Sequence, residues 1–195
     1  PHSELGQALA VLARLHPGDG RALLARAVNA PGVLQAQFYS GAFVLDALAR
    51  AGLHEIGCRL IRERWGPMLG DGQGTLWEER QIYVQDRGDG IPKPFLRSRC
   101  HPWAGSPLSW LNRHVLGLRV EEVGGPLVIA PNPAGLARAE GRLHCAHGLV
   151  EASWKVVDGK RIVAKACVPK GTPTQLRPPP GWEDRCEAKV VERDA

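Results

Sequence analysis

The first third of the chain repeats its apolar residues at steps of three and four, which is the period of helices that bury one face. Ser3 suits a helix N-cap, and the glycine- and proline-rich residues 16–20 separate the first helix from the second. Gly52 is a C-terminal stop after the third. Four helices are predicted, at residues 3–15, 21–28, 35–51 and 54–64. Their short connections predict antiparallel neighbours.

The apolar stripes of these helices predict their core-facing sides. In the third helix the stripe begins at Phe38 and passes through Gly41 to Leu48. The remaining stripe residues are Leu5, Ala8, Leu9, Leu12 and Leu15 in the first helix, Val44 and Leu45 in the third, and Ile56, Leu60 and Ile61 in the fourth.

The helical pattern stops after Trp65-Gly66-Pro67, and residues 68–102 are rich in glycine and charge. A connection of this length in a compact domain is usually functional or disordered. Its aromatic residues argue against disorder. A further helix is predicted at residues 106–116, with Leu108, Leu111 and Val115 on one face.

From Val120 onwards the apolar period changes from 3.6 to 2, which indicates strands. Val150, Ala152, Trp154 and Val156 fall on one face, and Asp158-Gly159 is a strong signal for a tight hairpin. The predicted strands are residues 126–130, 136–146, 149–157, 160–168, 172–176 and 187–191. The fold class predicted is α+β, with a helical part followed by an all-β sandwich.

Composition and charge argue against two classes of binding partner, nucleic acids and membranes. The chain has 195 residues and a formal net charge of +5, with lysine and arginine scattered along it. Because nucleic-acid surfaces concentrate basic and aromatic residues on one element, we expect no nucleic-acid partner. No apolar run approaches the roughly 20 residues that span a bilayer, so we expect no membrane partner. The chain begins at Pro1, and we expect it to be part of a longer protein.

Five widely spaced cysteines, without a C-x-x-C pair, favour free and mostly buried thiols in a reducing compartment. This predicts a cytoplasmic protein. His144-Cys145-Ala146-His147 has the composition of a metal clip, but neighbouring strand residues point to opposite faces, so no metal site is expected. The cysteines are Cys58, Cys100, Cys145, Cys167 and Cys186.

The segment Gly72-Gln73-Gly74-Thr75-Leu76-Trp77-Glu78 combines a glycine-rich turn, an aromatic residue and an acid. A tryptophan beside a carboxylate suits sugars, because C–H faces stack on aromatic rings while the carboxylate handles a proton. Glu78 is the leading catalytic candidate, and a surface glutamate paired with Arg80 is the alternative. Other acids nearby lack distinguishing context: Asp71, Glu79, Asp86 and Asp89.

His101 and Trp103 lie in a second candidate segment, residues 99–107, just before the predicted helix at 106–116. A histidine beside a tryptophan suits a hydrogen bond to a sugar hydroxyl with the ring packed alongside. A histidine satisfied by backbone groups is an equally good interpretation of these residues alone.

The order of several motifs resembles a known family. The segment 38–48 is followed by W-G-P-M-L at 65–69, G-T-L-W-E at 74–78, C-H-P-W-A-G-S-P at 100–107, and G-L-V-E-A-S-W at 148–154. This succession, from about Ser3 to Val168, resembles the C-terminal part of bacterial α-L-rhamnosidases of glycoside hydrolase family 78.

The resemblance implies the end of an (α/α)6 barrel, the six-hairpin glycosidase domain, at residues 1–119 and a C-terminal β-sandwich domain at 120–195. It implies inverting hydrolysis of terminal α-L-rhamnosides, with a rhamnose-containing glycoside as substrate and no metal or organic cofactor. The family's threonine-aromatic-glutamate motif makes Glu78 the general base and places Trp77 at the substrate. The family's His-x-Trp loop implies that His101 and Trp103 line the sugar pocket.

One departure from the family concerns its second catalytic group, the general acid. The general acid and the early substrate-binding carboxylates of the family precede the part of the barrel that this chain resembles. We therefore expect the missing N-terminal part of the same protein to complete the enzyme, and the isolated chain to be inactive. The alternatives are another (α/α)6 glycosidase, or a non-catalytic carbohydrate-binding or structural remnant.

Overall fold

The computed structural model forms two compact units, Pro1–Leu108 and Ser109–Ala195. It describes residues 2–28, 30–70, 72, 74–79, 83–85, 93–95 and 98–194, with only the backbone of 83–85 and 93–95. Helices fill the first unit and two sheets dominate the second, so the predicted α+β class is confirmed. The assignment of residues 1–119 and 120–195 to barrel and sandwich domains stays a prediction.

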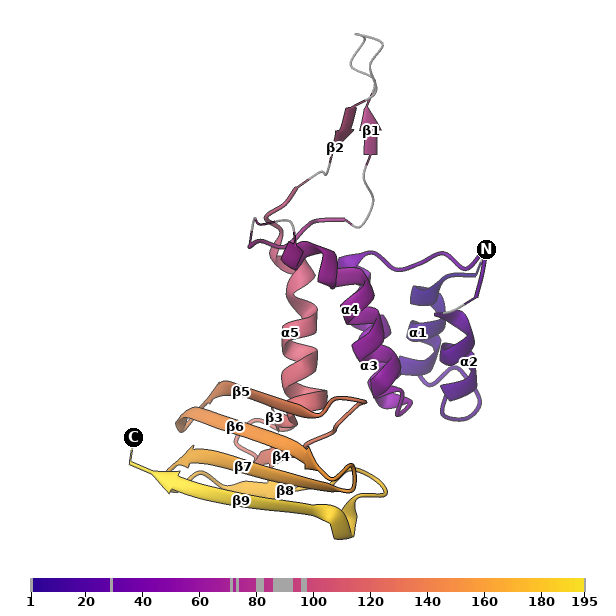
Figure 1. Ribbon diagram of the computed structural model, residues 1–195. Helices are drawn as coiled ribbons and strands as arrows, with labels where there is room; N and C mark the ends of the chain where they lie inside the picture. The colour runs from indigo at the N-terminus through magenta and orange to yellow at the C-terminus, as the bar shows by residue number, and fades with distance from the viewer. Residues whose placement is uncertain are drawn as a thin grey trace. The chain divides into compact units, whose positions relative to one another are not determined.

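The first unit includes the helices α1 (Glu4–Leu12), α2 (Arg21–Ala27), α3 (Phe38–Arg50) and α4 (His54–Gly70), and α3 packs against both α1 and α4 (Figure 1). Ser3 caps α1, since its Oγ accepts a hydrogen bond from the Gly6 N–H at 3.0 Å. Gly52 ends α3 with a φ of 70°. The predicted α3 stripe is buried, and Leu48 is fully enclosed.

The stripe predicted for α1 is partly wrong. Leu9 is 44% exposed and Leu15 is 79% exposed, whereas Glu4 is buried together with Ala8 and Val11. The carboxylate of Glu4 is paired inside the unit, and this pairing turns a different face of the helix toward the core.

The fourth helix was predicted to stop at Arg64, and this boundary is wrong, since α4 continues through Pro67 to Gly70. A proline inside a helix removes one backbone hydrogen bond. Burial offsets this cost, because Trp65 is 7% exposed and Met68 is 3% exposed. The extension places Trp65 where it can reach a segment that follows in the chain.

The long connection at residues 68–102 contains a pair of short antiparallel strands that the sequence analysis missed. These are β1 (Tyr83–Gln85) and β2 (Lys93–Phe95), in a register that pairs Val84 with Pro94. Three of the acids considered above, Asp71, Asp86 and Asp89, lie outside the described residues, as does Arg80.

The predicted helix at 106–116 is present but changes type partway. Its first part is α5 (Ser106–Leu111), and the second part, η2 (Asn112–Leu116), is π-helical. The period of the buried side chains therefore shifts: Leu108 is 73% exposed, and Trp110 is buried instead. The 3-10 turn η1 (Pro102–Gly105) precedes α5.

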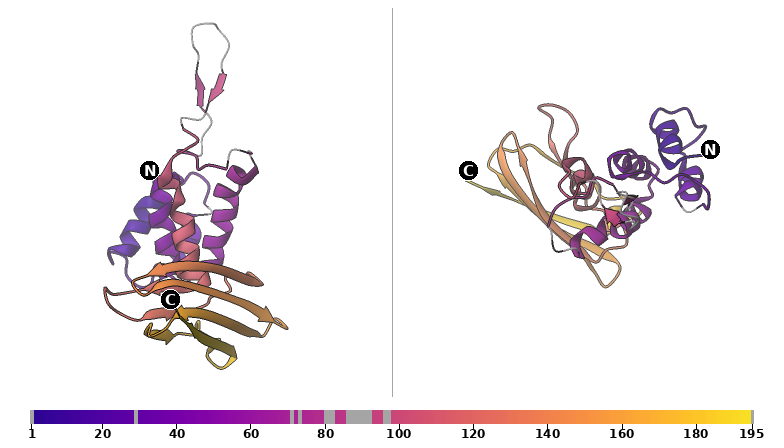
Figure 2. Two further views of the ribbon diagram at one scale, coloured as in Figure 1. Left: turned by 90° about the vertical axis from the view of Figure 1, so that its left-hand side faces the viewer. Right: turned by 90° about the horizontal axis from the view of Figure 1, so that it is seen from above.

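The second unit contains two sheets (Figure 1, Figure 2). The three-stranded sheet has the order β3 (Leu118–Val120), β4 (Leu127–Ile129), β8 (Thr174–Leu176). The four-stranded sheet has the order β5 (Arg138–Cys145), β6 (Gly148–Val157), β7 (Arg161–Pro169), β9 (Cys186–Arg193). The pairs β4–β8 and β7–β9 are parallel, the other pairs are antiparallel, and η3 (Glu183–Arg185) precedes β9. The predicted sandwich packing stays a prediction.

The alternation predicted for β6 is confirmed. Val150 and Trp154 are buried, and the Trp154 Nε1–H donates to the Val115 carbonyl at 3.0 Å. The predicted hairpin joins β6 to β7, with positive φ angles at Asp158 (52°) and Gly159 (63°). Both residue types tolerate this backbone, which explains the turn.

All five cysteines are free, but the prediction that most are buried is wrong. Cys58 is buried, Cys100 is exposed, and the other three are half-buried. Burial raises the pKa of the Cys58 and Cys186 thiols. None of the described helices is long and apolar enough to cross a membrane.

Candidate functional site

Two segments that are far apart in the sequence lie together at the candidate site. The Glu78 N–H donates to the Ser98 carbonyl at 2.8 Å, and the His101 N–H donates to the Leu76 carbonyl at 2.8 Å. These two backbone hydrogen bonds hold residues 76–78 alongside 98–101. They explain how residues from the two separate motifs meet.

The helices anchor the turn that directly follows residues 98–101. The Trp65 Nε1–H of α4 donates to the Ala104 carbonyl at 2.7 Å, and this hydrogen bond is buried. Gly41 of α3 makes room for the Trp65 ring, because a Cβ at Gly41 would lie 2.9 Å from the ring atom Cη2. Phe38 packs on the same ring with a centroid distance of 5.0 Å. The extension of α4 past its predicted end is therefore what positions the turn carrying Trp103.

Glu78 and His101 face each other across this junction. The Glu78 Oε2 lies 3.9 Å from the His101 Nδ1, which is longer than a hydrogen bond. The side chains are 19% and 32% exposed, respectively. The carboxylate is thus partly enclosed yet reachable by solvent, as proton transfer from a bound water requires.

An aromatic surface adjoins the carboxylate. The Trp103 and His101 rings have centroids 4.0 Å apart with planes 35° apart, and the Trp103 Nε1–H donates to the Glu78 carbonyl at 3.2 Å. Tyr39 lies with its ring centroid 5.4 Å from that of Trp103 and is 57% exposed. Exposed aromatic faces with polar edges beside an acid are suited to a sugar.

The structure thus brings together three of the four predicted site residues: Glu78, His101 and Trp103. Trp77 is half-buried directly before Glu78, and its place in the sugar pocket stays a prediction. Sequence reasoning missed Tyr39. The available signal was its position in a helix, off the apolar stripe that begins at Phe38, where a large aromatic residue must face outward.

The possible metal clip in β5 shows no converging ligands. His144 is exposed, and Cys145, its neighbour along the strand, is half-buried. Across the described ranges, no group of three or more His, Cys, Asp or Glu residues is arranged to hold a metal ion.

The amino-acid sequence matches no protein-family model and no curated protein. Among solved structures, the chain is similar to the crystal structure of a GH78 family rhamnosidase of Bacillus sp. GL1, with a TM-score of 0.77 and 25% sequence identity. The similarity covers 100% of this chain and 20% of that chain, so this chain spans one fifth of the length of the protein it matches. The resemblance indicated by the sequence motifs is confirmed, and the chain has the fold of the C-terminal region of a GH78 family rhamnosidase.

Proposed function

We propose that the protein containing this chain is an inverting α-L-rhamnosidase in which this chain supplies the general base. The observation that carries the proposal is the cluster of Glu78, His101 and Trp103 in a chain whose fold matches a GH78 rhamnosidase. A carboxylate between an imidazole and a tryptophan provides both a proton acceptor and an apolar wall for a sugar ring.

In the proposed reaction, Glu78 takes a proton from a water molecule as its oxygen attacks the anomeric carbon. The bond between that carbon and the leaving oxygen breaks, and the leaving oxygen receives a proton from a carboxylic acid elsewhere in the whole protein. The two carboxyl groups of an inverting pair lie roughly 6.5–9.5 Å apart, which leaves room for the water.

The neighbouring side chains orient the sugar in this proposal. His101 hydrogen-bonds a sugar hydroxyl, and Trp103 and Trp77 pack on the methyl group and C–H faces of rhamnose. Tyr39 extends the same aromatic surface, since its ring lies against Trp103. No metal or organic cofactor is required by this chemistry.

The direct test is Glu78→Gln in the complete protein, with turnover of an aryl α-L-rhamnoside as the measurement. Removing a general base costs about 10²–10⁴-fold in rate, so we expect a loss of that order. Glu79→Gln is the matched control, because it makes the same change one residue away and should retain turnover within a few-fold of wild type. Turnover near the wild-type level in the Glu78 variant would remove Glu78 as the base.

A second variant, Glu78→Ala, separates lost chemistry from lost folding. Azide is already an anion and needs no base, so we expect it to restore turnover and to give a rhamnosyl azide of inverted configuration. Failure of azide in a variant that still binds rhamnose would count against the proposed role.

A panel of aryl glycosides tests the sugar. We expect α-L-rhamnosides to be the preferred substrates of the complete protein. Preference for another sugar would indicate a different (α/α)6 glycosidase, and sugar binding without turnover would indicate the non-catalytic alternative.

A further inference from the structure

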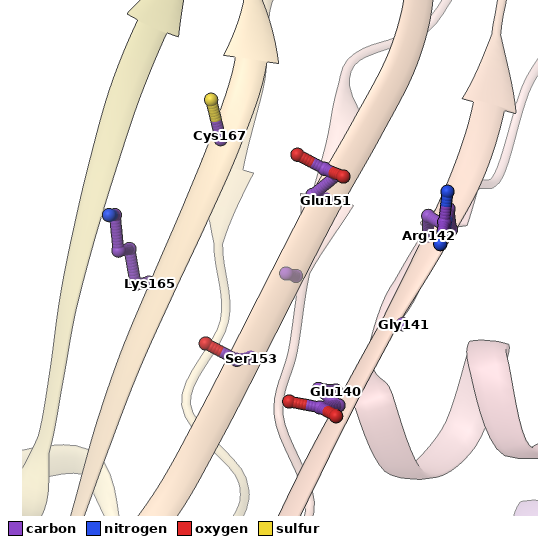
Figure 3. Close-up of a pocket in the computed structure, with 8 residues that line it drawn as sticks. Glu140, Gly141, Arg142, Glu151, Ser153, Lys165 and Cys167 are labelled. Atoms are coloured by element: carbon purple, nitrogen blue, oxygen red, sulfur yellow. The ribbon is translucent and has the colours of Figure 1, made fainter.

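The outward face of the four-stranded sheet carries a depression of about 490 Å³, far along the chain from Glu78. Its walls come from β5, β6 and β7, and Figure 3 shows their side chains on one face of adjacent strands. Gly141 and Ala152 contribute to its lining, and the other lining side chains are polar or charged, apart from a thiol: Glu140, Arg142, Glu151, Ser153, Lys165 and Cys167.

Strand register arranges the key groups in a row. Glu140 pairs with Ser153, Ser153 with Lys165, and Lys165 with Lys189 of β9. Residues in register on neighbouring strands point to the same face, and the strands lie about 4.8 Å apart. One line across the sheet therefore presents a carboxylate, a hydroxyl and two ammonium groups.

Most of the charge in this row is uncompensated. Glu151, in the adjacent row, accepts from Arg193 at 2.9 Å, so its charge is balanced. Among the described residues, Glu140, Lys165 and Lys189 have no ion-pair partner, and all three are exposed. Their hydrogen-bonding groups are therefore available to a ligand.

The sheet beneath the row is closely packed. Inward-facing residues of the same strands, such as Val150 and Ile162, are 0% exposed. The packed strands fix the spacing of the backbone positions in the row before a ligand arrives, while the exposed lysine side chains become ordered only on binding.

The composition of the row selects the chemistry of the ligand. Trp154 is the only Trp, Tyr or Phe in these four strands, and it faces inward at 3% exposure. A ligand on this face is therefore held by hydrogen bonds and charge and not by ring stacking. Glu140 accepts hydrogen bonds from hydroxyl groups, while Lys165 and Lys189 attract an anion.

We propose that this face binds a polysaccharide that carries uronic acid residues, with the sugar carboxylate at Lys165 and Lys189 and its hydroxyl groups at Glu140 and Ser153. A polyphosphate fits less well, because it has no hydroxyl groups to donate to Glu140 and Ser153. A nucleic acid fits less well, because no aromatic residue of these strands stacks on its bases. The proposal goes beyond the rhamnosidase activity and uses no residue of the Glu78 site.

The test is calorimetric binding of trigalacturonate to the complete protein and its variants. We expect Lys165→Ala and Lys189→Ala each to weaken binding about three- to tenfold, as loss of a partly exposed charged hydrogen bond does. Lys160→Ala is the matched control, because Lys160 is also an exposed lysine and lies in the β6–β7 turn, outside the row. An equal loss in the control would show that only net charge matters and would overturn the proposal.

Glu140→Gln decides between a built site and general attraction to a positive surface. A built site loses a carboxylate acceptor, so binding of trigalacturonate weakens. General attraction strengthens instead, because the substitution removes a negative charge. Tighter binding in this variant, equal affinity for polyphosphate, or no binding of trigalacturonate at millimolar concentration would each overturn the proposal. Thermal melts of the variants check that these surface changes leave the fold intact.

Discussion

At the scale of single residues, the ion pair between Glu4 and Arg64 stands out because water scarcely reaches it. Their side chains are 1% and 5% exposed, and the two carboxylate oxygens accept from the guanidinium at 2.6 and 2.8 Å. Glu4 Oε2 also accepts from the Ala36 N–H at 2.8 Å. One acid therefore ties together α1, α4 and the segment before α3.

Arg64→Ala should lower the free energy of unfolding of the helical unit by about 3–5 kcal/mol, because it leaves the Glu4 charge buried without a partner. Urea titration of the far-ultraviolet circular dichroism measures this. Arg62→Ala is the control, since Arg62 lies on the exposed side of the same helix. Replacing both partners, as Glu4→Leu with Arg64→Met, should recover most of the loss, and a double variant as unstable as Arg64→Ala would contradict this account.

The same pair shows why part of the fold could not be predicted from the sequence. Glu4 reads as a solvent-facing residue in a first helical turn, and its partner is 60 residues away. Local patterns carry no information on such a distant partner, so the predicted stripe of α1 fell on Leu9 and Leu15. Glu78 and His101 could be proposed as site residues because the order of motifs, unlike the pairing of distant residues, can be read along the chain.

At the scale of elements, the crossing of α3 and α4 depends on Gly41, above which the Trp65 ring lies. This contact positions the Trp65 side chain, whose Nε1–H donates to the Ala104 carbonyl. Ala104 belongs to the turn Pro102–Gly105, which also carries Trp103. The packing of two helices thus determines the position of Trp103, an exposed residue of the candidate site.

Gly41→Ala should destabilise the helical unit by about 1–3 kcal/mol, since the added methyl overpacks the Trp65 ring by more than helix propensity recovers. Under the proposed function it should also lower kcat/KM, because the turn with Trp103 moves. Gly70→Ala is the control: Gly70 is helical with nothing within 4 Å of the added Cβ, so stability should stay equal or rise by up to about 1 kcal/mol. Thermal melts and rhamnoside turnover measure the two effects, and equal behaviour of both variants would exclude the packing explanation.

A surface cluster next to β3 should make the stability of the second unit, here called the β unit, sensitive to acid. Glu121 accepts from Arg119 at 2.9 Å and from Arg177 at 2.6 Å, and these hydrogen bonds lower the pKa of its carboxyl from the ordinary 4.5. A lowered pKa stabilises the fold at pH values above 4.5, and the contribution disappears as pH falls through the lowered value.

Glu121→Gln should therefore lower the melting temperature of the β unit slightly at neutral pH and leave it unchanged at strongly acidic pH. Differential scanning calorimetry at both pH values measures this. A melting temperature that drops by the same amount at both values would show that the charge of Glu121 is not the cause.

The predicted boundaries of helices and strands were correct where local chemistry sets them. They were wrong where tertiary packing sets them. Ser3 and the Asp158-Gly159 turn act through their own backbone neighbours, and both predictions are confirmed. Pro67 signals the end of a helix, yet burial of Trp65 and Met68 carries the helix through it. A local sequence pattern of two or three residues does not show whether the burial of distant contacts outweighs the cost of a proline in the helix.

At the scale of the whole molecule, the chain forms two compact units, and each contains buried side chains. The core of the first includes Leu48 and Val44, and that of the second includes Val150 and Ile162. The order of helices before strands was predicted from the change of period near Val120. The parallel pairing of β7 with β9 could not be predicted in this way, because the chain between them first contributes β8 to the other sheet.

Leu48→Ala should destabilise the helical unit by about 2–5 kcal/mol, because it leaves a cavity at a fully enclosed site. Hydrogen exchange followed by mass spectrometry should show lost protection in α3 and unchanged protection in β6 and β7. Leu9→Ala, at an exposed position of α1, should change neither. Equal loss of protection in both units would contradict a local effect of the Leu48 cavity.

The crossing between β7 and β9 has a consequence for the order of folding. After β7 the chain contributes β8 to the three-stranded sheet and only then returns as β9. Parallel pairing across such a connection closes late, because the loop entropy is lost before the contacts form. Lys189 joins Lys165 only when β9 pairs with β7, so we expect the row proposed to bind uronic acid to be completed late in the assembly of the sheet. Its ligand would distinguish a finished sheet from an unfinished one, and would hold the final strand in place.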